Sequence, residues 1–179
     1  MSTRVSRNMV RLGDGLARFL VDHWLFLING ALLLVVSASL SAPCLTQSGH
    51  PYLASLAYKG FSSICHQKPE RSLLFLGAPM AVCARCFAVY ASLLGTGLLF
   101  TFLRRLWRNQ LPRISLRLPA LAALPLIVDA GTQLTGLRES TQALRIITGG
   151  LAGAGAGILV LFFLERAFRE ARDSVTETQ

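Results

Sequence analysis

The chain has 179 residues, of which 53% are hydrophobic and only 15% are charged, and its mean hydropathy is +0.51. Soluble domains carry about 25% charged residues, so the composition excludes an ordinary soluble enzyme and predicts an integral membrane protein with one domain. The net charge is +9, but the basic residues lie at the ends of apolar runs and not along one polar face, which argues against nucleic-acid binding.

The first apolar run predicts a membrane-spanning helix over residues 24–42, because a bilayer core of about 30 Å requires about 20 apolar residues in a helix. A small-residue stretch near its end resembles the cleavage site of a signal peptide, but the preceding arm is long for such a peptide and contains Asp14. We therefore expect an uncleaved anchor. Residues 51–64 are too short and interrupted to span, so they predict an interfacial helix with aromatic side chains such as Tyr58 at headgroup depth.

Three further spans are predicted in the rest of the chain. The second covers residues 79–103, the third covers residues 118–134 with a kink at Pro125, and the fourth covers residues 146–164. The predicted fold class is therefore an all-α membrane protein, with four transmembrane helices plus an interfacial helix between the first and the second.

The distribution of basic residues predicts the orientation of these helices. Of the eighteen Lys and Arg residues, four lie in the arm before the first span, five in residues 104–117 and three after residue 165. By the positive-inside rule these parts are cytoplasmic, and both termini face the cytoplasm from a multi-pass protein of the inner membrane. The chain then divides into a basic arm (1–21), a four-helix membrane domain (22–165) and a polar tail (166–179), expected to be disordered after Asp173.

Small residues in the fourth span predict close helix packing. Gly149, Gly153 and Gly157 recur at every fourth position, and small residues at this spacing let helix backbones approach each other in lipid. We expect a packing face within the molecule rather than a dimer interface.

Two segments combine residue types that carry chemistry. One is CHQKPERS at 65–72 followed by CARC at 83–86, and the other is DAGTQLTGLRESTQALRIITG at 129–149, predicted as the outer turn between the third and fourth spans. In the combination of C-H-Q-x-P-E-R-S, C-x-R-C and D-x-x-T-Q-x-x-G-x-R-E-S-T-x-x-x-R, the chain resembles a family of small bacterial and archaeal membrane proteins known only as a domain of unknown function. The resemblance covers about residues 55–160. It implies a shared site without naming a reaction.

The first segment also predicts a metal site. Cys65, His66, Cys83 and Cys86 have the spacing C-H-x16-C-x2-C, and three Cys with one His would complete a tetrahedral zinc site. Adjacent residues such as Cys65 and His66 point in different directions on a helix or a strand, so both reach one ion only through an irregular turn. If one of them alone binds, three protein ligands and an open position remain, which is the pattern of catalytic zinc.

Other interpretations fit the same cysteines. Cys83 and Cys86 also suit a disulfide or a redox pair, and buried thiols often serve packing alone. The sequence leaves open whether Cys44 pairs with Cys65. The pattern argues against a c-type haem, because Phe87 and not His follows the second cysteine of the pair.

Charged residues near the bilayer are costly, and they are usually paired or functional. We expect Asp129 to pair with Arg145 or Arg85 across the bundle, either as part of a site or as a salt bridge that fixes the fold. Ser140 or Thr141 is expected to cap the helix that follows. Candidate ligand-binding residues of an arginine-lined pocket are Arg71, Arg85, Gln133, Arg138 and Arg145, and candidate catalytic residues are Glu70, Asp129 and Glu139. Such a pocket suits an anion or a lipid phosphate.

The leading hypothesis is a membrane protein with a Cys/His zinc site and this arginine-lined pocket at its outer face. The alternatives are a thiol–disulfide or quinone-linked oxidoreductase that uses Cys83 and Cys86, and a non-enzymatic accessory subunit of a membrane complex. Expected partners are membrane lipid, an anionic ligand and a partner membrane subunit or second copy, but no nucleic acid. The sequence leaves open whether the protein is an enzyme.

Overall fold

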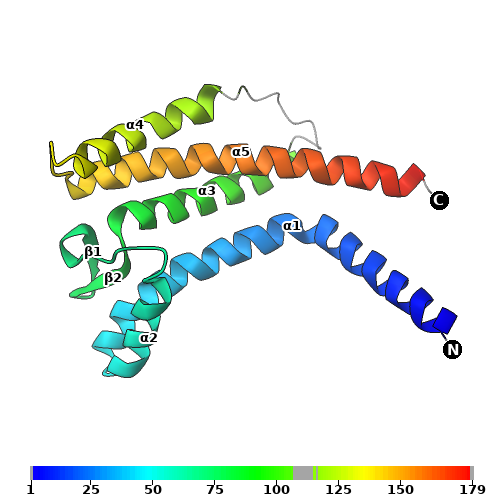
Figure 1. The fold of residues 1–179 in the computed structure, drawn as a ribbon, viewed down its shortest axis with the longest axis horizontal. Helices are drawn as coiled ribbons and strands as arrows, with labels where there is room; N and C mark the ends of the chain where they lie inside the picture. Colours follow the sequence, from blue (N-terminus) through cyan, green and yellow to red (C-terminus); the bar gives the residue numbers. More distant parts are fainter. Residues whose placement is uncertain (1, 107–114, 116, 178–179) are drawn as a thin grey trace.

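The computed structural model describes residues 2–106, 115 and 117–177. In this part of the chain, helices form most of the structure, and a two-stranded antiparallel sheet lies between the second and third of them (Figure 1). The elements in chain order are α1 (Ser2–Gln47), α2 (Pro51–Phe61), a 3₁₀ turn (Pro69–Arg71), β1 (Ser72–Phe75), β2 (Ala78–Cys83), α3 (Ala84–Leu106), α4 (Arg117–Leu134) and α5 (Gln142–Glu177). The predicted all-α class is therefore correct for the bulk of the protein and wrong at the hairpin.

Among the described residues, three helical segments are long and apolar enough to cross a membrane, namely Gly15–Gln47 of α1, the whole of α3, and Gln142–Ala171 of α5. They contain most of the first, second and fourth predicted spans. Helix α4 has 18 residues, close to the predicted third span, but it is not among these three. It carries Arg117 and Asp129, and its length of about 27 Å is just short of a bilayer core.

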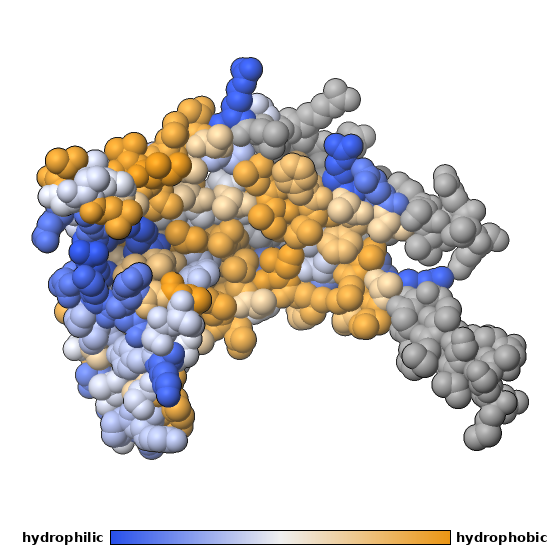
Figure 2. Space-filling model, in the orientation of Figure 1, coloured by the Kyte–Doolittle hydropathy of each residue, from blue (hydrophilic) through white to orange (hydrophobic). Residues whose placement is uncertain are grey.

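The surface has an apolar middle and a polar end. Large apolar side chains such as Phe26, Leu34, Val128 and Phe163 are exposed on several helices. Figure 2 shows a broad hydrophobic zone over the helices and a hydrophilic end where α2 and the hairpin lie. Both chain termini lie toward the opposite end (Figure 1). An exposed apolar zone of this extent is expected for a protein that is solvated by lipid.

The contact between α3 and α5 depends on glycine. A Cβ atom at Gly149 would lie 2.6 Å from the Arg85 carbonyl oxygen, and one at Gly153 would lie 2.5 Å from the Val89 carbonyl oxygen. A Cβ atom at Gly157 would meet the side chain of the α3 residue Thr96 at 3.2 Å. The two helices therefore run parallel and in register, and the predicted intramolecular packing face is confirmed.

A hydrophobic core joins α1 to the same pair of helices at the end far from the hairpin. Its buried members are Trp24 and Leu25 of α1, Phe100 of α3 and Leu161 of α5. Near this core, the Asn29 side-chain amide of α1 donates a hydrogen bond of 3.0 Å to the Thr101 hydroxyl of α3.

The hairpin corrects the predicted second span, which was expected to begin at residue 79. Residues 78–83 form β2, and the helix begins only at Ala84. The reason is the two-residue turn before it, where Leu76 and Gly77 have φ values of +52° and +81°. Two successive positive φ values make the tight turn that suits a two-stranded hairpin, and so the apolar run after it pairs with β1 instead of starting a helix.

The helix ends also differ from the prediction. Helix α1 begins at Ser2, so the basic arm is part of a helix, and α5 continues to Glu177, past Asp173 where disorder was expected. Helix α2 confirms a short helix between the first two spans. The Tyr58 hydroxyl of α2 donates a hydrogen bond of 2.6 Å to the Pro79 carbonyl, so this tyrosine ties α2 to the hairpin.

The glycine contact gives a direct test of the fold. Gly153→Ala places a methyl group against the α3 backbone, and overpacking of this kind costs about 1–3 kcal/mol. We expect a lower midpoint of thermal unfolding for the protein in detergent, followed by tryptophan fluorescence. Gly150→Ala is the matched control, because a Cβ atom there meets nothing within 4 Å. Equal midpoints for the two variants would contradict the close α3–α5 contact.

Candidate functional site

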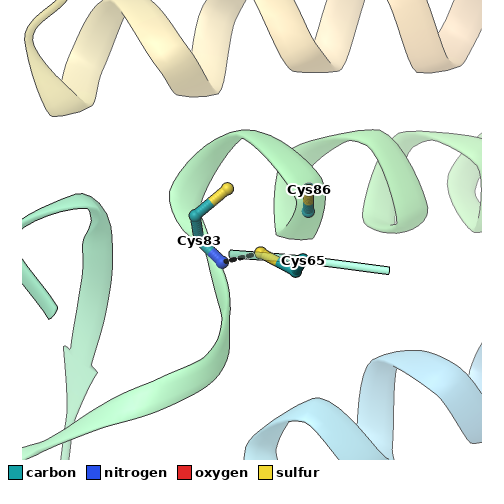
Figure 3. A group of neighbouring side chains, drawn as sticks. All are labelled: Cys65, Cys83 and Cys86. Atoms are coloured by element: carbon teal, nitrogen blue, oxygen red, sulfur yellow. Dashed lines mark hydrogen bonds between the residues drawn. The ribbon is translucent and has the colours of Figure 1, made fainter. Parts of the chain in front are cut away.

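Three cysteines from different parts of the chain lie together at the start of α3 (Figure 3). Cys65 follows α2, Cys83 ends β2, and Cys86 lies in the first turn of α3. Their sulfur atoms all lie within 4.8 Å of one another. A tetrahedral metal with bonds of about 2.3 Å to sulfur needs sulfurs about 3.8 Å apart, so the arrangement is close to that of three thiolates on one ion. None of the four cysteines of the chain is in a disulfide.

The loop that carries Cys65 is held by hydrogen bonds to its neighbours. Gln67 has a φ of +47°, so the backbone makes an irregular turn directly after Cys65 and His66. Its side-chain amide donates to the Tyr58 carbonyl at 2.6 Å and to the Ala81 carbonyl at 2.8 Å, so it ties the loop to α2 and β2. The Cys83 backbone N–H in turn donates to the Cys65 sulfur at 3.2 Å. Cys65 is therefore fixed against the start of α3.

His66 lies outside this group. Its side chain is exposed, whereas the neighbouring Cys65 is buried. In the part of the chain that the structure describes, no His, Asp or Glu joins the three sulfurs. The structure thus brings together three of the four predicted ligands. His66 is left out because its side chain diverges from that of Cys65 even in this irregular turn.

The surroundings of Cys83 favour its thiolate. The hydrogen bond with the Cys86 side chain is the main cause that lowers the pKa of Cys83, and it outweighs burial, which acts in the opposite direction. The position of Cys83 directly before α3 adds the positive end of a helix dipole. A thiolate at this position is the form that binds metal or attacks a disulfide.

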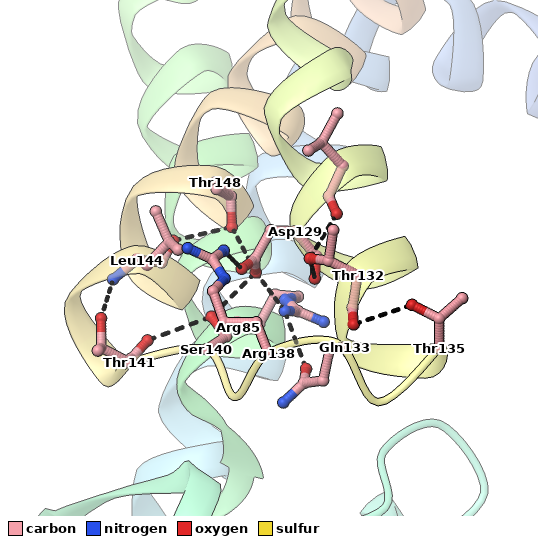
Figure 4. Close-up of polar contacts among 11 residues, drawn as sticks. Arg85, Asp129, Thr132, Gln133, Thr135, Arg138, Ser140, Thr141, Leu144 and Thr148 are labelled. Atoms are coloured by element: carbon pink, nitrogen blue, oxygen red, sulfur yellow. Dashed lines mark hydrogen bonds and ion pairs between the residues drawn. The ribbon is translucent and has the colours of Figure 1, made fainter.

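A second polar group includes Arg85, which lies between Cys83 and Cys86 in the sequence (Figure 4). Its centre is Asp129 of α4, which is only 2% exposed and forms ion pairs with Arg85 of α3 and with Arg138, the latter at 3.0 Å. The Ser140 hydroxyl donates to the same carboxylate at 3.1 Å, and the Thr148 hydroxyl of α5 lies 3.5 Å from it. The predicted pairing of Asp129 with Arg85 is confirmed.

Arg145 and Gln133 border this network without completing it. The Gln133 side-chain oxygen accepts a bond of 3.3 Å from Arg85, but its amide nitrogen is buried without a partner. Arg145 is 6% exposed, and its side chain makes no hydrogen bond or ion pair to any described residue. The alternative pairing of Asp129 with Arg145 is therefore not formed.

The remaining candidates lie at the surface. Glu70 and Glu139 are exposed, and Arg71 is half-buried. Within the described residues, none of the three belongs to an ion pair. Of the three candidate catalytic residues, only Asp129 is therefore buried within a polar network.

Sequence reasoning did not assign Ser140 and Thr148 to this network. Ser140 was a candidate helix cap, but Thr141 takes that role, since its hydroxyl oxygen accepts a 3.3 Å bond from the Leu144 backbone N–H. Thr148 follows Arg145 by three residues, a spacing that places both on one helix face. This spacing is the signal by which the sequence could have linked Thr148 to the charged residues of the site.

The chain is similar to proteins described only as membrane proteins or as uncharacterised. The family model described as "Predicted membrane protein (DUF2085)" matches residues 65–159, which contain both segments of the site. An uncharacterised protein of Methanocaldococcus jannaschii is 40% identical over 119 residues, covering 66% of this chain and 72% of the relative. An uncharacterised protein of Methanothermobacter thermautotrophicus is 38% identical over 99 residues, covering 55% and 86%. No solved structure matches significantly.

The network around Asp129 predicts a large loss of stability on removal of its charge. Asp129→Asn leaves the largely buried Arg85 without a counter-charge, whereas the half-exposed Arg138 stays solvated, and breaking a buried ion pair from one side costs about 3–5 kcal/mol. We expect a lower unfolding midpoint in detergent, partly restored by adding Arg85→Gln. Glu139→Gln, an exposed change in the adjoining loop, is the control and leaves the midpoint unchanged. An Asp129→Asn variant as stable as wild type would exclude a structural role for this carboxylate.

Proposed function

The chain belongs to the DUF2085 family of predicted membrane proteins, and we propose that it binds one metal ion, preferably zinc, through Cys65, Cys83 and Cys86. The observation that supports this proposal is the convergence of three sulfurs from a loop, a strand end and a helix start. Packing alone does not require three thiols at one point, whereas a thiophilic ion does.

The proposed centre keeps one coordination position for a further ligand. Three protein ligands plus an exchangeable fourth is the arrangement of catalytic zinc. Cys83 and Cys86 are half-buried, so the fourth position is not sealed by the protein. A metal bound here would supply Lewis acidity or an activated water. Cys65 would hold it from the loop after α2 and Cys86 from the first turn of α3, and the lowered pKa of Cys83 would favour a thiolate ligand.

We further propose that all four long helices cross the membrane, with α4 as the third span. Helices α3 and α5 run parallel, as their glycine contacts require, so the chain must return across the bilayer between them. Helix α4 is the described helix in that interval and packs antiparallel to α5, with Pro119 near Gly155 and Asp129 near Thr148. The positive-inside rule then places the termini in the cytoplasm and the cysteines at the outer face of the inner membrane.

A second candidate function is thiol–disulfide exchange. The lowered pKa of Cys83 and the closeness of Cys86 favour it. Joining the Cys83 thiolate to the Cys86 thiol would release two electrons and one proton, and the electrons would pass to a quinone or a partner disulfide. A third candidate is an accessory role in a membrane complex, which a stable copurifying subunit would support.

Elemental analysis tests the metal proposal. Protein purified in detergent without chelators should contain about one zinc per chain, and Cys83→Ser should lose most of it because one of three ligands is gone. Cys44→Ser is the matched control, since Cys44 lies outside the three-sulfur group and should leave the metal content unchanged.

The same samples separate metal binding from redox chemistry. Mass spectrometry after alkylation should find the three thiols protected by metal and released by a chelator. Metal-free protein in which Cys83 and Cys86 change between thiol and disulfide with the redox poise would overturn the metal proposal in favour of the oxidoreductase.

Reporter fusions test the third span. Alkaline phosphatase, which is active only outside the cytoplasm, should be active when fused after Leu137, an exposed residue beyond α4. Fusions after Leu106 and at the C-terminus should be inactive, with a cytoplasmic fluorescent reporter giving the opposite pattern. Equal activity after Leu106 and Leu137 would show that α4 does not cross.

A further inference from the structure

We infer that the end of the bundle formed by α3, α4 and α5 contains a binding site for an oxyanion of the phosphate class, with Arg145 as its charged anchor. This site goes beyond the proposed metal centre. It rests on a different observation, the buried donors around the Asp129 network that have no acceptor.

Arg145 carries the first part of the argument. Its side chain is more than nine-tenths buried, its Nε–H is fully shielded, and no described residue accepts a hydrogen bond from its guanidinium. A shielded donor without an acceptor is costly, and more so when it belongs to a charged group. A guanidinium retained under these conditions indicates that an acceptor outside the described residues completes it.

Two further donors share this condition at the same end of the bundle. The Nε–H of Arg85 and the side-chain N–H₂ of Gln133 are also buried and without a partner. These two groups are neighbours, because the Arg85 Nη2 atom donates a hydrogen bond of 3.3 Å to the Gln133 side-chain oxygen. In Figure 4 the Gln133 amide nitrogen points away from Asp129, so it does not serve that carboxylate.

The packing of α5 on α3 brings Arg145 to these donors. A Cβ atom at Gly149 would lie 3.3 Å from the Arg85 Cγ atom, so this turn of α5 lies directly on the Arg85 side chain. Arg145 precedes Gly149 by four residues and occupies the same helix face one turn, about 5.4 Å, nearer to the start of the helix. Buried donors from α3, α4 and α5 therefore lie within about one helical turn of one another along the bundle.

The charge of this region favours an anion as the acceptor. Three guanidinium groups, those of Arg85, Arg138 and Arg145, stand against the single carboxylate of Asp129 among the buried or paired residues. The excess is two positive charges, from three minus one, and it falls to one where Cys83 is the thiolate that its lowered pKa favours. A neutral ligand or water would satisfy the donors but not this charge.

A phosphate group fits the donors better than a carboxylate. It offers more than two acceptor oxygens for donors that arrive from three helices, and guanidinium groups bind phosphate through two parallel hydrogen bonds. The same chemistry is provided by free phosphate and by the phosphate of a lipid headgroup, which would reach a site at a helix end from the bilayer interface.

A stability titration tests the site. In detergent, replacing sodium chloride by sodium phosphate at constant ionic strength should raise the unfolding midpoint of the wild type by about 5 °C or more at a hundred-fold excess over Kd. Arg145→Gln and Gln133→Leu should weaken phosphate binding, the first by about ten-fold or more, because each removes one buried donor. Arg166→Gln, the same change at a residue that is 82% exposed on the opposite end, should bind phosphate as the wild type does.

The stability of Arg145→Gln without phosphate separates a ligand-binding role from a structural one. If Arg145 serves a ligand, removal of its unpaired charge leaves the anion-free protein as stable as wild type or more stable. If it instead serves the fold, the variant unfolds at a lower temperature and retains any response to phosphate, and the inference is overturned.

A parallel measurement distinguishes the two sources of phosphate. Phosphatidylglycerol retained through detergent washing by the wild type but not by Arg145→Gln, detected by mass spectrometry, assigns the site to a lipid headgroup. A midpoint shift with inorganic phosphate alone assigns it to free phosphate. If neither response is observed, the inference is overturned. Both measurements are repeated in the Cys83→Ser variant. A phosphate or lipid response that persists there shows that the anion site does not depend on the proposed metal centre.

Discussion

The contact between the backbones of α3 and α5 determines where every chemically active group of this protein lies. Glycine at positions 149, 153 and 157 removes the side chains that would hold the two helices apart. Because the helices then run parallel, the first turn of α3 comes level with Gly149, about two turns into α5. The cysteines, Arg85 and Arg145 consequently meet at one end of the molecule.

The bundle carries charge at both ends of this contact and apolar side chains between them. Asp129 is paired at the cysteine end, and at the other end the almost fully buried Glu165 of α5 pairs with Arg104 of α3 and Arg169. Each carboxylate has two arginine partners, so the desolvation of the acid is offset by more than one charge. Charges at the ends and an apolar middle are the distribution that a bilayer imposes on a helical bundle.

The sequence was sufficient where one strong pattern governs the structure. Hydropathy located α4 to within one residue, the glycine spacing identified a packing face, and intramembrane charge identified Asp129 with Arg85. It failed where local geometry decides. The apolar run at 79–83 has no periodicity that separates a strand from a helix start, and the positive φ of Leu76, which no propensity suggests, makes it a strand. The exposure of His66 depends in the same way on the backbone of a loop and not on residue type.

The C-x-R-C sequence joins the two polar groups through one turn of helix. Cys83 and Cys86 bracket the turn that faces Cys65, while Arg85 between them extends to Asp129 on α4. A ligand that fixes the thiols must therefore also fix the backbone from which the Arg85 guanidinium is directed, and a change at Asp129 acts on the thiols by the same route. The spacing of this short motif is thus constrained from both sides: a residue more or fewer between the cysteines would turn the arginine away from its carboxylate.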